Sequence, residues 1–449
     1  MAAYLFCLTA EGGVPLFSRT KGDLKPLPFP VIGSLNGVHM FASNQAVSLL
    51  STTTDDAKVV WRVFHDSLTL IMVSGDDNAC DCHFNQLLNL VFQSMVLVYG
   101  QDDLIHIKNV ERFKKEIKVC YHMVDTLLSH DELSTFSDVT NAVDTILAPE
   151  NQVLQAFLDA FVEAADSSYG CLLVHGKVAV ATRKWWTFTS TELVLLSMIV
   201  AASPKCSSRD IPVFLPHTSP TVPHRLLTYQ LMKGVEVCAV CGPNPSLASL
   251  EMEVGRFWRA AYESLKAVSR LHPRNFPTNM PIDQNILGFL LVNVESHKSL
   301  CTVQPMEEDT RKTGKTMGTM RRREILRSFY KYVVGTYFPS TIEGSSEEPS
   351  QFSHKVLETY ITSDTHKCYA IQSGPHQMFA LFQPCHPHLR NEICNTEDND
   401  YVYQRQDCPF ITHHNLLLNV IPSGQQSFFC IGLVNIIFWL LIFYKNMNM

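Results

Sequence analysis

The same order of apolar segments occurs three times along this chain, and this repetition is the feature that most limits its possible folds. Each copy opens with two short apolar strands around a tight turn and continues through a helix and further apolar strands. The opening strand pairs are Tyr4–Leu8 with Val14–Phe17, Tyr169–Val174 with Lys177–Ala181, and Leu287–Val294 with Ser299–Val303. A small unit that repeats in this way predicts three domains of one α/β type.

The length of the chain agrees with that number, because 449 residues suggest about three domains of ordinary size. We expect the first domain at residues 1–130, the second at 150–272 and the third at 281–384. The polar stretch 343–353 reads as a loop inserted into the third domain. Residues 385–449 form an atypical tail with an apolar segment at 428–444.

The first copy contains two strands whose apolarity is nearly continuous, Lys58–Phe64 and Ser67–Val73. Such strands need cover on both faces of their sheet. Apolar residues at helical spacing predict that cover at 84–98 and 110–128, and a proline-led segment, Pro30–Asn44, predicts another helix. The expected fold is an α+β sandwich in which an antiparallel five-stranded sheet lies between helices.

The second copy is entered through an amphipathic segment, Val153–Val162, so that a helix precedes its hairpin. Thr189 or Ser190 is expected to cap a helix over 192–201. Further expected elements are strands at 211–215, 225–231 and 235–240 and a long helix over 247–268.

The third copy contains a predicted helix, Arg321–Tyr337, and strands at 357–362, 367–371 and 378–382. No amphipathic helix follows Pro384 in the sequence. We therefore expect the third domain to be incomplete at its C-terminal helix.

Composition excludes some classes of partner and compartment. The net charge of −7 gives no reason to expect nucleic acid. Fourteen cysteines are too sparse for a disulfide scaffold, and the first residues do not read as a secretory signal. Both observations favour a reducing cytosol.

Two short motifs resemble chemical sites but do not carry one. Gly314-Lys315-Thr316 lacks the glycine that a phosphate loop needs five positions earlier, where Asp309 stands. Cys238 and Cys241 have redox spacing, but in a strand they point to opposite faces and read as small core residues. We find no catalytic constellation and expect neither enzymatic activity nor a cofactor.

Metal-ligating residues gather in two places. Cys80, Cys82 and His83 are spaced too tightly to form a complete zinc site. The tail residues Cys385, His386, His388 and Cys394 offer four ligand types, although in an irregular context.

A basic run, which includes Arg321, Arg322 and Arg323, is either a solvated loop and helix start or a patch for an acidic partner or lipid head groups. The apolar tail segment Phe428–Tyr444 reads as a membrane anchor, a variant carboxyl end or a buried closing helix. Its shortness and context favour the variant end, and a tail-anchored membrane trafficking protein stays as the alternative function.

Longer stretches resemble the fuzzy family of planar cell polarity effectors. The residues that carry this resemblance are Leu27–Phe41, Phe64–Ile71, Ile107–Arg112, Val213–Leu227, Cys241–Pro243 and Asp283–Leu291. The resemblance covers nearly all of residues 1–384 and implies three longin domains. It further implies pairing with an Inturned-type three-longin protein and the WD-repeat protein Wdpcp in the CPLANE assembly.

Membership of that assembly, which the resemblance implies, carries with it roles in intraflagellar-transport recruitment at basal bodies, ciliogenesis, protein transport and Hedgehog-dependent development. A Rab-type small GTPase is the expected ligand of the paired longin domains, and guanine-nucleotide exchange would come only from the heterodimer. The implied location is the cytoplasm, cytoskeleton and cilium basal body, with peripheral membrane contact. We expect Val31, Leu35, Val38 and Phe41 to belong to the partner interface.

Overall fold

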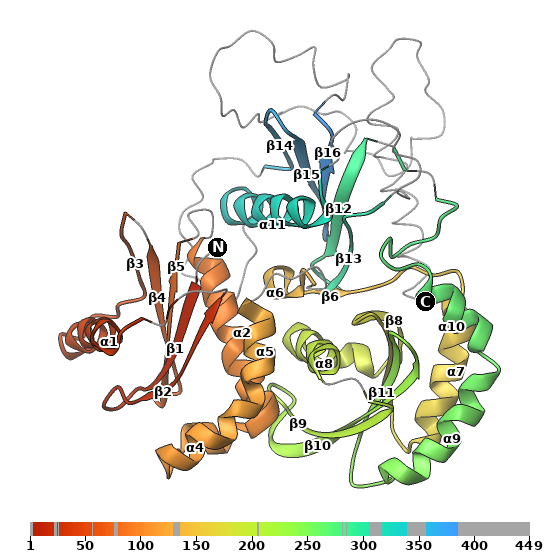
Figure 1. Ribbon diagram of the computed structural model, residues 1–449, viewed down its shortest axis with the longest axis horizontal. Coiled ribbons are helices and arrows are strands. Elements are labelled where there is room, and N and C mark those ends of the chain that lie inside the picture. The colour runs from red at the N-terminus through yellow and green to blue at the C-terminus, as the bar shows by residue number, and fades with distance from the viewer. Residues whose placement is uncertain are drawn as a thin grey trace. The chain divides into compact units, whose positions relative to one another are not determined.

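The computed structural model describes residues 3–21, 25, 27–55, 57–75, 80–128, 135–203, 206–280, 282–283, 285–305, 317–338 and 356–384. The chain divides into two compact units (Figure 1). The first unit comprises Met1–Pro277 and Val292–Cys301, and the second comprises Thr278–Leu291 and Thr302–Met449.

The first sheet has the strand order β2-β1-β5-β4-β3, and all of its pairings are antiparallel. Its strands are β1 (Ala3–Thr9), β2 (Pro15–Lys21), β3 (Ser51–Thr53), β4 (Lys58–Phe64) and β5 (Leu68–Ser74). Helix α1 (Phe29–Asn44) covers one face, and helix α2 (Asp81–Tyr99) covers the other (Figure 1). The predicted five-stranded antiparallel sheet between helices is therefore confirmed for this copy.

The prediction of one helix over 110–128 is wrong in detail. The segment is divided into α4 (Val110–Glu116), a 3₁₀ turn (Ile117–Cys120) and α5 (Tyr121–Leu128). Apolar residues of all three pieces still enter one core, so the segment keeps one buried side despite the 3₁₀ turn in its middle. Short elements that the sequence did not predict are α3 (Gln101–Ile105), α6 (Ser137–Thr140) and β6 (Val143–Asp144).

The second sheet has the order β8-β7-β11-β10-β9 and repeats the first sheet's arrangement. Its strands are β7 (Tyr169–Val174), β8 (Lys177–Ala181), β9 (Ser208–Leu215), β10 (Ser219–Met232) and β11 (Val235–Cys241). The helices around it are α7 (Asn151–Ala164), η2 (Trp185–Thr187), α8 (Ser190–Ala202), α9 (Leu247–Arg259) and α10 (Tyr262–Ser269).

Thr189 caps α8 in a capping box with Glu192, as one of the two expected cap residues. The long helix expected over 247–268 is broken at Ala260 and Ala261. Trp258 before the break and Leu265 after it both pack into one core against the sheet. A twisted sheet turns away beneath a straight helix, and the break keeps both halves in contact with it.

The first two copies share a hydrophobic core. One cluster joins a face of each sheet through α2, α5 and α8, which lie between them (Figure 1). A second cluster fills the space between the other face of the second sheet and α7, α9 and α10. Cys238 belongs to the first cluster and Cys241 to the second. The interpretation of these cysteines as core residues on opposite faces is confirmed.

The third copy begins with β12 (Ile286–Asn293) and β13 (Lys298–Thr302). It continues through α11 (Thr319–Thr336), β14 (Glu358–Thr362), β15 (Lys367–Ser373) and β16 (His376–Phe382). In the second unit, β14, β15 and β16 pair antiparallel in chain order, and Phe329 and Tyr330 of α11 pack on Phe379.

Strand β13 also pairs in parallel with β6 within the first unit, where Lys298 aligns with Val143 and Ser299 with Asp144. The Oγ of Ser299 donates a hydrogen bond of 2.6 Å to the Asp144 carboxylate. This third sheet therefore departs from the expected five antiparallel strands by a sixth strand, β6, that pairs in parallel. The polar loop 343–353 and the end of the chain after Pro384 lie outside the described residues.

Candidate partner-binding surface

Helix α1 rests on the outer face of the first sheet. Pro28 stands at its N-cap and a proline opens its first turn, where a missing N–H removes no helical hydrogen bond. Ile32 and Leu35 pack on a cluster that includes Phe6 and Trp61. The Trp61 indole N–H also donates to the Leu35 carbonyl at 3.2 Å. These contacts fix which side of α1 faces the sheet.

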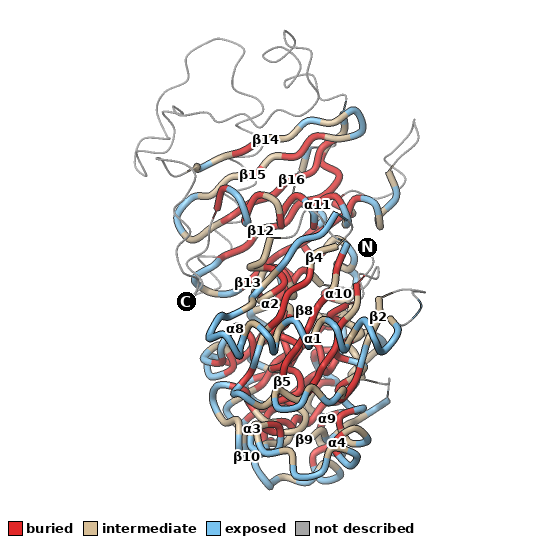
Figure 2. Tube along the Cα trace, turned by 90° about the vertical axis from the view of Figure 1, so that its left-hand side faces the viewer, coloured by how far each residue is buried: buried red, intermediate tan, exposed pale blue. Residues whose placement is uncertain are grey.

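No residue of α1 is fully buried, and its outward side is apolar. Val31, Ser34, Val38 and Phe41 recur at steps of three and four, which places them along one side of the helix. Val38 is 56% exposed and Phe41 is 69% exposed. We call Val31, Val38 and Phe41 the α1 stripe. Figure 2 shows α1 as an exposed to half-buried tube.

The exposed apolar surface continues beyond the helix. Of the sixteen large hydrophobic residues that are exposed in the described part of the chain, seven lie between residues 29 and 50. Val47 and Leu50 extend the surface toward β3, a three-residue strand at the edge of the sheet. An exposed apolar area next to a strand edge is typical of a protein interface.

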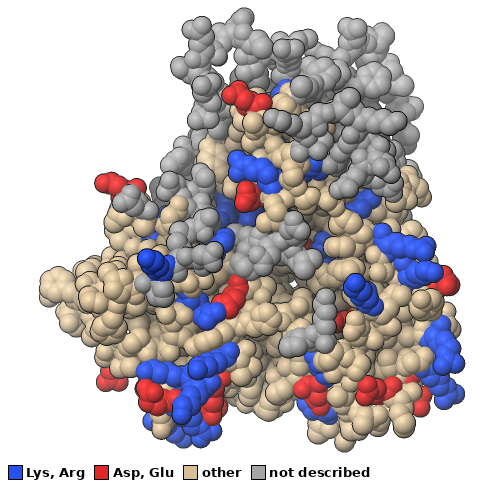
Figure 3. All heavy atoms as spheres, viewed as in Figure 1, with Lys and Arg blue, Asp and Glu red and all other residues tan. Residues whose placement is uncertain are grey.

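This surface also lacks charge. Helix α1 contains neither an acidic nor a basic residue, apart from His39. Burial lowers the pKa of His39, so its ring is neutral at physiological pH. Figure 3 shows the region of α1, at the left, without blue or red spheres. Interface centres are similarly depleted of charged residues.

The structure places the four predicted interface residues on two sides of one helix. Val31, Val38 and Phe41 are exposed, whereas Leu35 packs against the sheet. Sequence reasoning did not single out Phe29, Met40, Val47 and Leu50, which are also exposed. The sequence did contain a signal for these four residues. The segment around α1 has more apolar residues than one buried helix face can hold.

The predicted basic patch is not one surface. Arg321 is exposed and pairs with Glu324 at 3.3 Å, whereas Arg322 is 2% exposed and donates to the Val303 carbonyl at 3.2 Å. Arg323 is half-buried. The three consecutive arginines point to different sides because successive residues on a helix are about 100° apart. The buried Arg322 is therefore unable to contact an acidic partner or a lipid head group.

Other sites considered from the sequence are placed as follows. Burial raises the pKa of the Cys241 thiol to about 11, and burial also raises the pKa of Cys238, so both cysteines stay protonated. Trp185 is buried, and the Lys298 ammonium lies over the Trp186 ring, 4.0 Å from its centroid.

Three of the sites considered from the sequence lie outside the described residues: Gly314–Thr316, the four tail ligands from Cys385 to Cys394, and Phe428–Tyr444. None of the helices in the described part of the chain reaches the length and apolarity that a bilayer crossing requires.

Three family models match this chain in succession. They are the first, second and third longin domains of FUZ, MON1 and HPS1, at residues 3–127, 165–259 and 285–389. The chain is 48% identical over 393 residues to the Protein fuzzy homolog of Xenopus tropicalis, covering 85% of this chain and 93% of that protein. It is 40% identical over 397 residues to the human Protein fuzzy homolog, covering 86% and 93% respectively.

Proposed function

Because this chain belongs to the fuzzy family of three-longin-domain proteins, we propose that it is a non-catalytic planar cell polarity effector that works by pairing with a second three-longin protein. The proposed partner is an Inturned-type chain, and the surface that joins it is the α1 stripe together with the neighbouring edge strand β3. The WD-repeat protein Wdpcp would complete a CPLANE assembly.

The single observation that supports this pairing is the uncovered outer side of α1. Val38 and Phe41 are more than half exposed in a helix that has no charge along its length. Truncation to alanine of one of the few side chains that dominate an interface typically weakens binding by about 2–4 kcal/mol. A helix with this composition is stabilised when a second apolar surface removes it from water.

The pair is proposed to bind a Rab-type small GTPase and to support intraflagellar-transport recruitment at basal bodies. Nucleotide exchange by such a pair would act through the conformation of the GTPase switch loops. That mechanism needs a complementary surface and no acid, base or nucleophile from this chain. It agrees with a candidate surface that carries only apolar and small polar side chains.

The test is co-expression of the full chain with the Inturned-type partner, followed by measurement of the dissociation constant. Val38→Asp and Phe41→Asp are each expected to weaken pairing by at least about 10-fold, because a carboxylate would be buried without a partner. Met252→Asp is the matched control, since Met252 is 80% exposed on α9 around the second sheet. Unchanged affinity in both α1 variants would exclude α1 as the pairing surface.

Exchange activity is measured on the co-purified pair across a panel of Rab-type GTPases. The pair is expected to accelerate nucleotide release from at least one of them, while this chain alone does not. Release that is equally fast with the unpaired chain would contradict the need for a heterodimer.

A further inference from the structure

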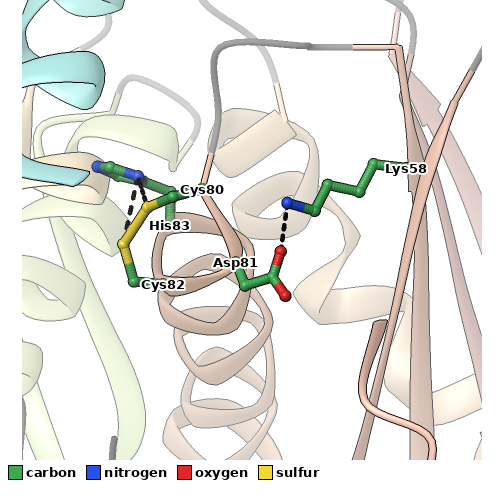
Figure 4. Close-up of a disulfide and its surroundings, with 5 residues drawn as sticks. All are labelled: Lys58, Cys80, Asp81, Cys82 and His83. Atoms are coloured by element: carbon green, nitrogen blue, oxygen red, sulfur yellow. Dashed lines mark hydrogen bonds and ion pairs between the residues drawn. A yellow bond between two sulfur atoms is a disulfide. The ribbon is translucent and has the colours of Figure 1, made fainter. Parts of the chain in front are cut away.

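Three metal-ligating atoms converge at the start of α2. Cys80 stands at the N-cap, and Cys82 and His83 follow in the first turn. The His83 Nδ1 lies 2.8 Å from the Cys80 Sγ and 3.6 Å from the Cys82 Sγ. All three ligand atoms lie within 4.8 Å of one another (Figure 4). The structure records the two cysteines as a disulfide.

The acidic residue inside this sequence does not belong to the group. The Asp81 carboxylate forms an ion pair with Lys58 on β4 and accepts a hydrogen bond from Ser51 on β3. Figure 4 shows Asp81 turned toward Lys58, away from the sulfur atoms and the imidazole. The cluster therefore offers two sulfurs and one nitrogen, without oxygen.

Sulfur and imidazole donors select borderline and soft cations such as Zn²⁺ and Cu⁺ over Mg²⁺ or Ca²⁺. Reduction breaks the bond between the two sulfurs, and small side-chain shifts then let a single ion bond at about 2.3 Å to both sulfurs and about 2.0–2.1 Å to nitrogen. The N-terminus of a helix also favours thiolates, because its unpaired N–H groups carry partial positive charge. His83 is 7% exposed, so its ring is held in place by the surrounding chain.

We propose that the reduced form of Cys80 and Cys82, together with His83, binds one thiophilic d¹⁰ cation, either Zn²⁺ or Cu⁺. Three residues supply ligands and water completes the coordination of Zn²⁺. This site is compatible with the spacing argument from the sequence, which excludes only a complete four-ligand zinc site. The disulfide form does not bind, because its sulfur atoms carry no negative charge.

The chemistry of loading balances in two steps. A dithiol such as dithiothreitol transfers two electrons and two protons to the disulfide, leaving two cysteine thiols and the cyclic disulfide of the reagent. Both thiols then lose their protons as two metal–sulfur bonds form, so that each bound cation releases two protons.

The experiment titrates the full chain, reduced with dithiothreitol and desalted, with Zn²⁺ and in a separate arm with Cu⁺, against a competing chromophoric chelator. One equivalent is expected to bind in at least one arm, and the arm with higher affinity identifies the cation. Cys80→Ser with Cys82→Ser is expected to abolish this equivalent. His83→Asn is expected to weaken binding by more than about 10-fold, since even an outer-shell partner of a ligand contributes about 10–100-fold.

Two controls separate this site from other thiols. Cys206→Ser is the matched control, because Cys206 is an exposed free cysteine outside the cluster, and binding should not change. The series is repeated in a background in which Cys385, Cys394, Cys408 and Cys430 are all replaced by Ser, so that tail thiols are not counted.

The oxidised wild-type chain is the control for folding, because among the described residues it differs from the reduced chain only in the Cys80–Cys82 bond. It is expected to bind no equivalent, with an unchanged circular dichroism spectrum. The proposal is overturned if reduced wild type and the Cys80→Ser, Cys82→Ser variant bind equally. It is also overturned if the oxidised chain binds as well as the reduced one.

Discussion

Helices α1 and α8 hold the same place in two copies of one fold, yet their surroundings are opposite. Each follows the opening hairpin of its copy and lies against the five-stranded sheet. Helix α8 has ten buried residues, and it lies in the core shared by the first two copies. Helix α1 has no buried residue and covers the outer face of the first sheet.

The difference teaches that a repeated fold does not repeat its surfaces. A helix that is apolar all round needs cover on all sides, and α8 obtains it from the first sheet's own helices, α2 and α5. Helix α1 has an apolar outward side with no second layer from this chain among the described residues. The fold thus uses one helix to join its first two copies and leaves the outward side of the other exposed.

The largest loss of stability is expected from Leu196→Ala, which removes a buried side chain from α8. Leu196 is fully buried in the core that joins the first two copies. The substitution is expected to lower the free energy of unfolding by about 2–5 kcal/mol, as measured by urea denaturation. Because the core is common, the transitions of both copies should shift together. A loss below about 1 kcal/mol would contradict the buried role of α8.

Glu192→Gln tests how the start of α8 is held. Burial raises the pKa of the Glu192 carboxyl, but this effect is outweighed by donors from Thr189, His217 and Thr218, so the pKa lies below its usual 4.5. The backbone N–H groups of His217 and Thr218 donate to it at 2.9 and 2.7 Å. The substitution is expected to remove about 1.5–3 kcal/mol of stability at pH 7.

The pH dependence of that loss has a definite sign. The ionised carboxylate stabilises the fold above the unfolded pKa, and this stabilisation disappears as pH falls through the lower folded pKa. Thermal unfolding measured from pH 7 downward should show the difference between wild type and Glu192→Gln shrinking below about pH 4.5. A difference that grows on acidification would contradict the assignment.

Ile32→Ala tests the side of α1 that faces the sheet. Ile32 is half-buried against the cluster around Trp61. The expected loss is about 1 kcal/mol, below that of a fully buried position, because part of the side chain already contacts water. Chemical denaturation measures it, and a loss equal to that of Leu196→Ala would mean that α1 is buried as deeply as α8.

The smallest stability effect is expected from Val38→Ser in the α1 stripe. The free energy of unfolding of the unpaired chain should change by no more than about 0.5 kcal/mol. The same variant should weaken association with the partner, so that stability and binding separate. A destabilisation comparable to that of Leu196→Ala would show that the stripe is covered within the chain itself.

Much of this fold follows from the sequence because its signals are local. The opening hairpins of the first two copies are marked by apolar runs around glycine turns, and Gly12 and Gly13 take the positive φ that the first turn requires. Thr189 and Glu192 are spaced as a capping box, and the structure forms it. The short β6 escaped prediction because two residues carry no periodic pattern. Its pairing with β13 depends on a segment more than 150 residues away.

The candidate surface was only partly predictable for a related reason. A proline-led apolar segment indicates the helix α1. The apolar residue type alone, however, does not distinguish a position in a core from an exposed position at an interface. Leu35 and Val38 are both aliphatic, and only the position of Trp61 and the sheet makes one inward and the other exposed.

By itself the sequence determined the number of copies, the order of the main strands and helices in each, and the family, because these depend on patterns within short segments. Tertiary structure alone decided that α8 is buried while α1 is exposed, and that Arg322 leaves the surface. These properties depend on which distant segments approach one another, because burial requires atoms that the local pattern does not contain.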